Sequence, residues 1–237
     1  MRTDLARDPD LVRLMKRAGC HTVFIGFESV NPESLQEMKK KQSLDDIREA
    51  IRIVQAAGIH IHGMFVFGFE EDDWNTVELT VRFAQEMKLT SVQLLILTPL
   101  PGSELYHKLS AQGRITSFNW DLYDTHHVVY RPARFTPFEL QCAQVYGHTQ
   151  IYALPEALKK LGTGRFVAAG LSLYAWKINR DWQKGNQFYL RELLAGANAP
   201  DVSAARVSGQ TSAPKDGWTD ATRRPAAVKL VPAALHP

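Results

Sequence analysis

Strand-like and helix-like hydrophobic patterns alternate along the first 115 residues, and this alternation limits the possible folds more than any other feature. Three short runs are rich in β-branched and aromatic residues, at 22–27, 60–67 and 91–97. Between them, apolar side chains recur every three or four positions, which is typical of helices buried on one side. Strands separated by such helices form βαβ units with parallel strands and right-handed crossovers. The sequence therefore predicts a parallel α/β sheet within residues 1–115.

Helix-start motifs agree with this pattern and extend it. Asn31-Pro32 places a capping side chain before a proline at the first helical position. The spacings Ser43 to Asp46 and Thr136 to Glu139 are those of capping boxes. Beyond residue 115 the strand pattern stops, and helices are predicted over 137–152 and roughly 165–194. We therefore expect a helical region over residues 116–195.

The composition excludes several classes of protein. With 237 residues, 45% of them hydrophobic, the chain is long enough for a sizeable core, and its net charge of +3 is too weak to indicate nucleic-acid binding. Apolar runs stay well short of the ~18 residues of a membrane helix. The first residues lack the apolar stretch of a signal peptide, so we expect a cytoplasmic protein with no membrane span. Two cysteines, Cys20 and Cys142, exclude a disulfide framework.

The last 42 positions, residues 196–237, have a different composition. They are rich in Ala, Pro, Ser, Gly and Thr and contain few large apolar side chains. Burying these groups would contribute ~10–20 kcal/mol, whereas ordering the backbone costs several tens of kcal/mol at ~1–2 per residue. The sequence predicts a disordered tail here.

Each predicted strand has one apolar and one mixed face, because side chains alternate along a strand. The mixed faces carry Glu28 on the first strand, His60 and His62 on the second, and Gln93 on the third. Closed eight-stranded barrels usually fill their interior with branched apolar side chains. The mixed faces therefore indicate either an open, ligand-lined cavity or a sheet with one face in solvent.

Polar residues and glycines also gather where the strands end. The first strand ends at Glu28-Ser29, the second at Gly68 and the acidic run 70–73, and the third at Thr98. Ligands of parallel α/β proteins bind beyond these carboxyl ends. A simpler interpretation makes Glu28 a carboxylate that stabilises the start of the following helix.

The histidines allow both metal and structural interpretations. His60 and His62 lie two positions apart on one strand face, a spacing that can chelate a metal, but no third ligand is evident. We interpret them as cavity-lining residues and assign no metal site. His126 and His127 fall in an irregular segment and are predicted to be a surface pair.

Taken together in this order, the strand-end motifs resemble radical S-adenosylmethionine (SAM) enzymes, especially the cobalamin-binding-type branch. The motifs are Gly26-Phe27-Glu28-Ser29, then residues 63–68 with Glu71, then residues 98–103. The helix 8–20 and the segments 120–123 and 136–140 are also similar, so the resemblance covers about residues 4–195. It implies a partial (βα) barrel of about three parallel strands in residues 1–115, followed by the helical region.

The resemblance also implies which residues form the site. The SAM contacts are expected at Glu28, Ser29, Met64, Val66, Gly68, Glu71, Leu97 and Thr98. The substrate pocket is expected to include His60, His62 and Gln93. Glu70 and Asp72 stand where many members of the family have proline and a second acid, so the loop is expected to differ in shape.

One departure from the family bears directly on function. The family holds a [4Fe–4S] cluster on three cysteines of a CxxxCxxC loop after its first strand, and this chain has no such loop. The chain resembles only the part of the barrel that follows the third strand. We therefore expect this chain alone to bind neither the cluster nor cobalamin and to be inactive by itself, with no catalytic residue assigned.

Three interpretations of function follow. The first is the carboxyl-terminal portion of a radical SAM enzyme, which makes a 5′-deoxyadenosyl radical for methyl transfer or rearrangement of an unknown small molecule. The second is a non-catalytic module that docks onto a separately encoded amino-terminal half, because the first strand would otherwise expose unpaired backbone groups. The third is a nonfunctional gene fragment.

Overall fold

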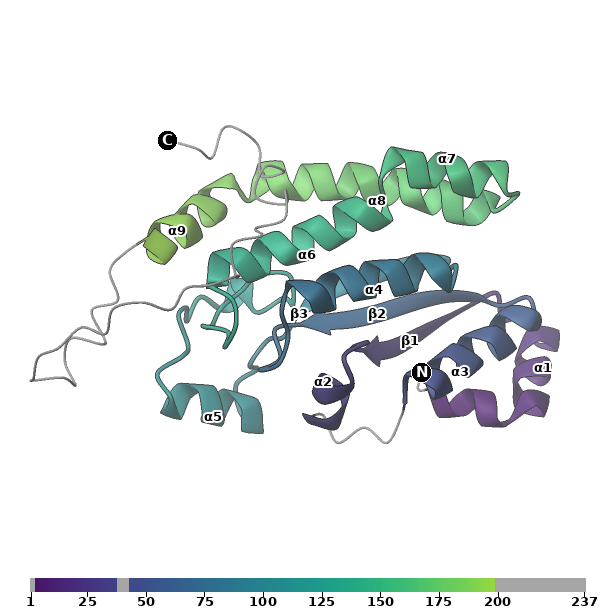
Figure 1. Ribbon diagram of the computed structural model, residues 1–237, viewed down its shortest axis with the longest axis horizontal. Coiled ribbons are helices and arrows are strands. Elements are labelled where there is room, and N and C mark those ends of the chain that lie inside the picture. The colour runs from purple at the N-terminus through teal and green to yellow at the C-terminus, as the bar shows by residue number, and fades with distance from the viewer. Residues whose placement is uncertain (1–2, 38–42, 199–237) are drawn as a thin grey trace, which may run out of the picture.

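The structure is a computed structural model that describes residues 3–37 and 43–198. Three parallel strands form one sheet in the order β1-β2-β3, and helices precede, connect and follow them (Figure 1). The strands are β1 (Thr22–Glu28), β2 (His60–Phe67) and β3 (Ser91–Ile96). The helices up to β3 are η1 (Thr3–Arg7), α1 (Pro9–Arg17), α2 (Pro32–Glu37), α3 (Leu44–Ala56) and α4 (Trp74–Glu86). Those that follow are α5 (Glu104–Ala111), η2 (Trp120–Leu122), α6 (Pro137–Ile151), α7 (Leu154–Gly162), α8 (Phe166–Gly185) and α9 (Gln187–Asn198).

The prediction of a parallel α/β sheet followed by helices is confirmed. Figure 1 shows the strand arrows pointing the same way, with α2 and α5 at the arrowhead end. The expected capping boxes are present: Ser43 with Asp46 begins α3, and Thr136 with Glu139 begins α6. Two boundaries differ from prediction: α7 was not foreseen, and the helix expected over 165–194 is broken at Asn186 into α8 and α9.

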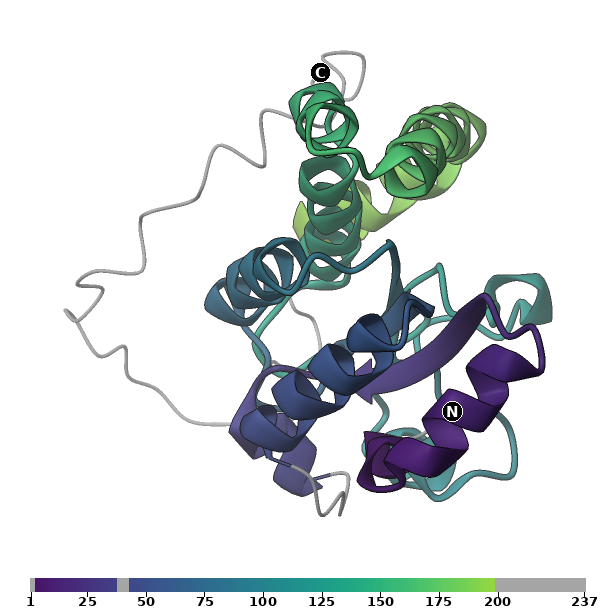
Figure 2. The same ribbon diagram turned by 90° about the vertical axis from the view of Figure 1, so that its right-hand side faces the viewer.

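The two faces of the sheet differ as the alternation predicts. Buried and half-buried residues alternate along β2 and β3, and the buried set includes Ile61, Phe65 and Leu94. Side chains of α3 and α4 join this buried set, and in Figure 2 both helices lie on one side of β1. The apolar face is thus covered by helices, which leaves the mixed face to form a site.

Helix α6 closes the outer edge of β3. Glycine at 147 allows this close approach, because a Cβ there would collide with the side chain of Leu94. The Tyr152 hydroxyl accepts from Val92 N and donates to Val92 O, at 2.6 and 2.5 Å. His148 Nε2 accepts the Leu94 N–H at 3.1 Å, and Gln144 donates to Leu94 O at 3.0 Å.

The loop before α6 completes this edge. Ile96 N donates to Thr125 O at 2.7 Å, and the Thr98 hydroxyl donates to Ile96 O. The backbone groups of Val92, Leu94 and Ile96 that point away from β2 are therefore all paired.

The division into a barrel part (1–115), a helical region (116–195) and a tail (196–237) stays a prediction. Most of the tail, residues 199–237, lies outside the described residues. None of the helices that the structure describes is long and apolar enough to span a membrane.

Candidate functional site

The carboxyl end of β1 brings Glu28 and Ser29 to the rim of the sheet. A β-bulge between Gly26 and Glu28 ends the regular pairing, and Glu28 has a φ of 69°, a region that non-glycine residues seldom adopt. Its carboxylate folds back over Gly26, where a Cβ would lie 2.6 Å from Glu28 Oε1. Ser29 is buried, and its Oγ accepts the N–H of Asn31 at 3.0 Å. Glycine at 26 thus leaves room for a carboxylate on the mixed face.

Gly68 ends β2 with a φ of 111°, and a Cβ there would collide with the hydroxyl of Tyr130. This hydroxyl donates to Gly68 O at 2.5 Å, while Gly68 N donates to Asp72 Oδ2 at 2.9 Å. Both its backbone conformation and its crowded surroundings therefore favour glycine. The predicted contact between Gly68 and SAM stays a prediction.

Asp72, where the sequence departs from the family pattern, is a buried carboxylate for which the sequence predicted no role of its own. It accepts hydrogen bonds from Gly68 N, Phe69 N and the hydroxyl of Ser34. Burial outweighs these hydrogen bonds and raises the pKa of Asp72 to about 6. The carboxyl ties the end of β2 to α2.

The acidic run after β2 contacts basic side chains at the surface of the rim. Glu71 pairs with Arg134, and Glu70 pairs with Arg114 at 2.7 Å. The SAM contact predicted for Glu71 stays a prediction, and the structure gives its carboxylate a cationic partner. Leu97 and Thr98 follow β3 at the same rim and are half-buried.

The strand register brings other predicted residues together on the mixed face. Gly26 pairs with Met64, and Met64 pairs with Gln93, so these three residues form one row across the sheet. Val66 lies one step nearer the carboxyl end on the same face of β2. The mixed face thus connects the rim with the residues predicted for the substrate pocket.

A groove of about 390 Å³ lies beside this face, between β3, α6 and α8. Its polar floor includes His62, Gln93, His126 and Gln144, and its apolar wall comes largely from α8. Its sixteen lining residues are His62, Ser91, Val92, Gln93, His126, Gln144, Val145, His148, Tyr152, Leu171, Tyr174, Ala175, Ile178, Asn179, Trp182 and Gln183.

Two of the three predicted pocket residues meet in this groove, but His60 does not line it. His62 Nδ1 lies 2.8 Å from Ser91 Oγ, and Gln93 Nε2 lies 3.5 Å from His126 Nε2. His60 instead borders a separate hollow with Lys88 and Gly164, at the amino end of β2. The roles of the three residues in binding a substrate stay predictions.

The surface assignment of the His126-His127 pair is wrong. His127 is buried, with Nδ1 2.9 Å from Asp124 Oδ1 and Nε2 2.8 Å from Asn186 Oδ1. His126 is half-buried and lines the groove. A histidine pair in an irregular segment carries no periodic signal, so its burial depends on contacts with α8 and α9 that sequence does not reveal.

The α8 wall of the groove was also missed. Leu171, Tyr174, Ile178 and Trp182 recur at three- and four-residue spacing, which places them on one helix face. That spacing is visible in the sequence, but it does not tell a ligand wall from ordinary packing.

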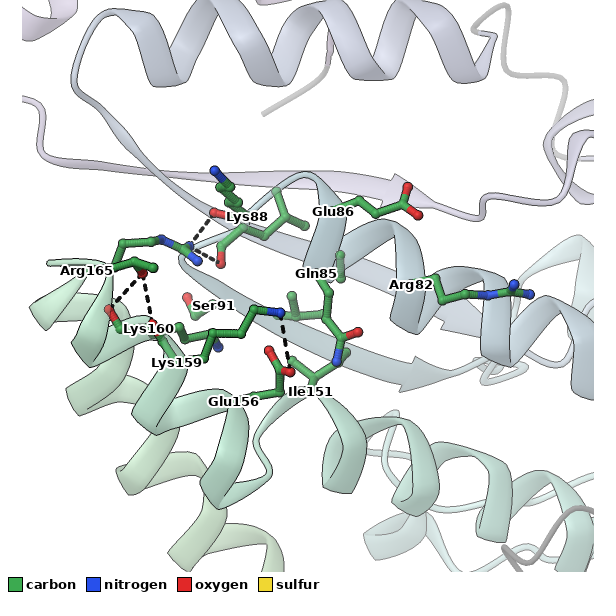
Figure 3. A pocket seen from close by; sticks show the side chains of 14 residues that line it. Arg82, Gln85, Glu86, Lys88, Ser91, Ile151, Glu156, Lys159, Lys160 and Arg165 are labelled. Carbon is green, nitrogen blue, oxygen red and sulfur yellow. Dashed lines mark hydrogen bonds and ion pairs between the residues drawn. The ribbon is translucent and has the colours of Figure 1, made fainter.

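A second hollow, of about 470 Å³, is charged and lies at the amino end of β3 (Figure 3). Arg165 reaches across it and donates to the carbonyl oxygens of Lys88 and Leu89, at 2.5 and 3.1 Å. Lys159 Nζ lies 3.7 Å from Glu156 Oε1. The buried Lys160 donates from Nζ to Ser172 Oγ at 2.7 Å. Burial lowers the pKa of Lys160 to about 8. Lys160 thus links α7 to α8, and Arg165 links the start of α8 to the segment before β3.

The residues of this chain do not fit a [4Fe–4S] cluster. The cluster needs three thiolates, and the chain has two cysteines. Cys20 donates to the carbonyl oxygen of Thr22, and burial raises the pKa of Cys142 to about 12, so this thiol stays protonated. Within the part of the chain that the structure describes, no three His, Cys, Asp or Glu residues are grouped to hold a metal ion.

The first part of the chain is similar to a known family. Residues 1–84 match the model of the radical SAM superfamily. An uncharacterized methyltransferase from Pyrococcus horikoshii is 29% identical over 150 residues, which are 63% of this chain and 33% of the relative. The bacteriochlorophyllide d C-12(1)-methyltransferase of Chlorobaculum tepidum is 32% identical over 127 residues, 53% of this chain and 27% of the relative. The chain therefore spans about a third or less of the length of these relatives.

A solved structure is also similar over part of the chain. It is the radical SAM methyltransferase TsrM from Kitasatospora setae, determined with cobalamin and a [4Fe–4S] cluster bound. The match has a TM-score of 0.41 and 20% sequence identity, and it covers 44% of this chain and 21% of that protein. The resemblance to radical SAM enzymes deduced from the strand-end motifs is confirmed by the family match over residues 1–84.

Proposed function

We propose that this chain contributes the SAM- and substrate-contacting part of a radical SAM enzyme whose complete form catalyses methyl transfer. The family match over residues 1–84 is the observation that carries this proposal. Methyl transfer is the reaction in the names of both curated relatives described above. The radical SAM resemblance gives SAM and a [4Fe–4S] cluster as cofactors of the complete enzyme, and the resemblance to the cobalamin-binding-type branch adds cobalamin.

The geometry of the rim supports a role in holding SAM. A carboxylate accepts hydrogen bonds from hydroxyl groups, and the Glu28 carboxylate lies on the mixed face, in the room over Gly26. In this proposal Glu28 orients the ribose hydroxyls, while Met64 and Val66 supply an apolar surface for the adenine. SAM supplies the methyl group and the source of the radical, and the residues of this chain position it.

The cluster has to come from another segment. With two cysteines this chain cannot supply the three thiolates, so we derive no step through the cluster from its residues. We propose that a CxxxCxxC segment encoded beside this chain supplies the cluster, either as a separate protein or as part of one longer chain.

The first test uses the chain with and without that segment. Incubated anaerobically with iron and sulfide, the isolated chain should develop no SAM-responsive [4Fe–4S] signal in electron paramagnetic resonance, whereas the co-expressed pair should develop one. A SAM-responsive signal from the isolated chain would contradict the proposal. If the native DNA encodes no CxxxCxxC segment beside this chain, the proposal is contradicted and the interpretation as a nonfunctional gene fragment is favoured.

The second test concerns Glu28. In the co-expressed pair, Glu28→Gln should weaken SAM binding, measured by equilibrium dialysis, by about tenfold or more, because hydrogen bonds to a charged group contribute ~1.5–3 kcal/mol. Glu49→Gln, at an exposed position of α3, is the matched control and should leave binding unchanged. Equal SAM affinity of the Glu28→Gln variant and the wild type would remove the proposed role.

A second function, docking without catalysis, is favoured by the edges of the sheet. The outer edge of β3 is saturated by α6 and the Thr125 loop, so docking by strand addition would have to take place beside β1. Co-purification from the native host tests this function, and a chain found only as a monomer would argue against it.

A further inference from the structure

The groove between β3, α6 and α8 combines two properties that together define a ligand. Its lining carries no formal charge at neutral pH, and it contains a buried hydrogen-bond donor that has no partner among the described residues. We propose that this groove binds the substrate of the proposed enzyme, and that the substrate is an uncharged, flat and largely apolar molecule with a hydrogen-bond acceptor. That the ligand is a substrate rests on the proposed function, whereas the chemical class of the ligand follows from the groove alone.

The absence of charge is evident from the lining. None of the sixteen lining residues is Asp, Glu, Lys or Arg, whereas the neighbouring charged hollow is lined by seven such residues, among them Lys160, Arg165 and Glu156. Burial lowers the pKa of His62 and His126, and it lowers the pKa of His148 to about 3. These three imidazoles are therefore neutral at pH 7. A charged ligand would lose its hydration in this groove without gaining a counter-charge.

The unpartnered donor is the side-chain amide of Asn179 on α8. Its Nδ2 is buried and has no hydrogen-bond partner among the residues that the structure describes, although buried amide groups are nearly always paired. Leaving such a donor unpaired costs ~1–3 kcal/mol. Asn179 also lines the groove, so a turn of its side-chain amide would bring the buried Nδ2 to a carbonyl or ether oxygen of a ligand bound there.

The shape of the ligand follows from the α8 wall. Tyr174, Ile178 and Trp182 stand on one face of the helix, opposite the polar floor that His62 and Gln93 form on the strands. Tyr174 and Ile178 are 64% and 45% exposed, so a large apolar area of this wall contacts water. A flat ring system would cover this wall with one face and leave its edge for hydrogen bonds to the floor.

The position of the groove agrees with a substrate site. Gln93 lines the groove and also belongs to the row Gly26–Met64–Gln93 on the mixed face, and Glu28 folds over Gly26. The groove and the proposed SAM contacts are thus continuous across one sheet face.

Three probes of nearly equal size separate the required features. The probe 2-acetylnaphthalene is uncharged and has an acceptor, 2-ethylnaphthalene lacks the acceptor, and 2-naphthoate is an anion. Equilibrium dialysis against the full chain should rank the ketone about three- to tenfold above the hydrocarbon, the value of one hydrogen bond. The anion should bind at least about tenfold more weakly than the ketone.

Two variants and one control locate the binding. Ala175→Trp fills the groove and should abolish binding of all three probes, while Leu173→Trp, at an exposed position of α8 outside the lining, should leave it unchanged. Asn179→Leu removes the donor, so the ketone should lose its advantage over the hydrocarbon while the hydrocarbon binds as before. Circular dichroism and urea unfolding establish that each variant folds.

The outcomes separate this inference from the proposed function. Equal affinity for the ketone and the anion, unchanged ranking in Asn179→Leu, or binding that persists in Ala175→Trp would each overturn the inference. The probes require neither SAM nor the cluster, so failure of the SAM experiments leaves this result intact. Conversely, a SAM-binding pair that takes up none of the probes would overturn this inference alone.

Discussion

The sheet and the last three helices are stabilised in different ways. In the sheet, the inward side chains Ile25, Ile61 and Leu94 are at most 1% exposed and belong to one apolar cluster. In α7, α8 and α9, many large apolar side chains remain exposed. They are Leu154, Leu158, Leu161, Phe166, Val167, Leu171, Leu173, Tyr174, Ile178 and Phe188.

Polar anchors attach these helices to the rest of the chain instead. Arg165 donates to the carbonyl oxygens at the start of β3, and Tyr189 donates to Val128 O at 3.1 Å. Asn186 Oδ1 lies within hydrogen-bond distance of His127 Nε2, at 2.8 Å. The difference teaches that apolar burial stabilises the sheet, whereas a small number of directional bonds position the helices that wall the groove. Such bonds fix orientation more than they add stability.

The largest effect should come from removing an aromatic ring from the sheet. Phe65 is fully buried, with its ring centroid 5.4 Å from that of Phe27 and 6.2 Å from that of Phe83. Phe65→Ala should lower the free energy of unfolding by about 3–5 kcal/mol in urea titration. The same substitution at Phe188 on α9, which is 74% exposed, should change it by less than about 0.5 kcal/mol. Similar losses at both positions would remove the contrast between the two regions.

The second effect concerns pH and the buried carboxyl of Asp72. Its pKa is about 6 in the folded chain, above the ordinary value of 3.8. The protonated form therefore contributes stability that is present below pH 3.8 and lost as pH rises through 6. The full effect is about 3 kcal/mol, from about 1.4 kcal/mol per pKa unit.

Comparison with Asp72→Asn isolates this effect, because the amide can still accept from Gly68 N and donate to Ser34. Between pH 4 and pH 7, wild-type chain should lose stability relative to Asp72→Asn in urea unfolding. Asp181→Asn, at an exposed position on α8, should show the same change in unfolding free energy between pH 4 and pH 7 as the wild type. Parallel stability curves for wild type and Asp72→Asn would show that the carboxyl has an ordinary pKa.

The smallest effect tests the junction between the two regions. Tyr152→Phe removes the hydroxyl that pairs with both Val92 N and Val92 O, and it leaves these edge groups buried without partners. It should cost about 1–3 kcal/mol in the free energy of unfolding and speed amide hydrogen exchange at Val92. Tyr174→Phe, whose ring is 64% exposed, should do neither. Protection of Val92 that survives Tyr152→Phe would mean that another group closes the edge.

Sequence reasoning succeeded where a signal is local. The strand faces follow from the alternation of Ile61, Phe65 and their neighbours, and the starts of α3 and α6 follow from capping motifs. Helix α7 was not predicted because its N-cap residue, Ala153, has no side chain that can cap the helix by a hydrogen bond. The break between α8 and α9 was not predicted because the apolar pattern continues past Gly185 and Asn186, although both residues weaken a helix at this point.

The site was harder to predict because its features depend on contacts between distant segments. The burial of Asp72 depends on Ser34, 38 positions away, and the closed edge of β3 depends on side chains 50 or more positions further along the chain. Asn179 is distinguished from an ordinary helix residue only by the groove around it. Such groups have no sequence signature of their own.

The closure of β3 by α6 restricts which edge of the sheet can take part in assembly with another chain. Side chains of the same polypeptide occupy the hydrogen-bonding positions that would otherwise let two sheets fuse at β3. A strand added to this sheet would therefore have to lie beside residues 22–28, next to the bulge that carries Glu28. The chain itself therefore blocks growth of this sheet on the β3 side.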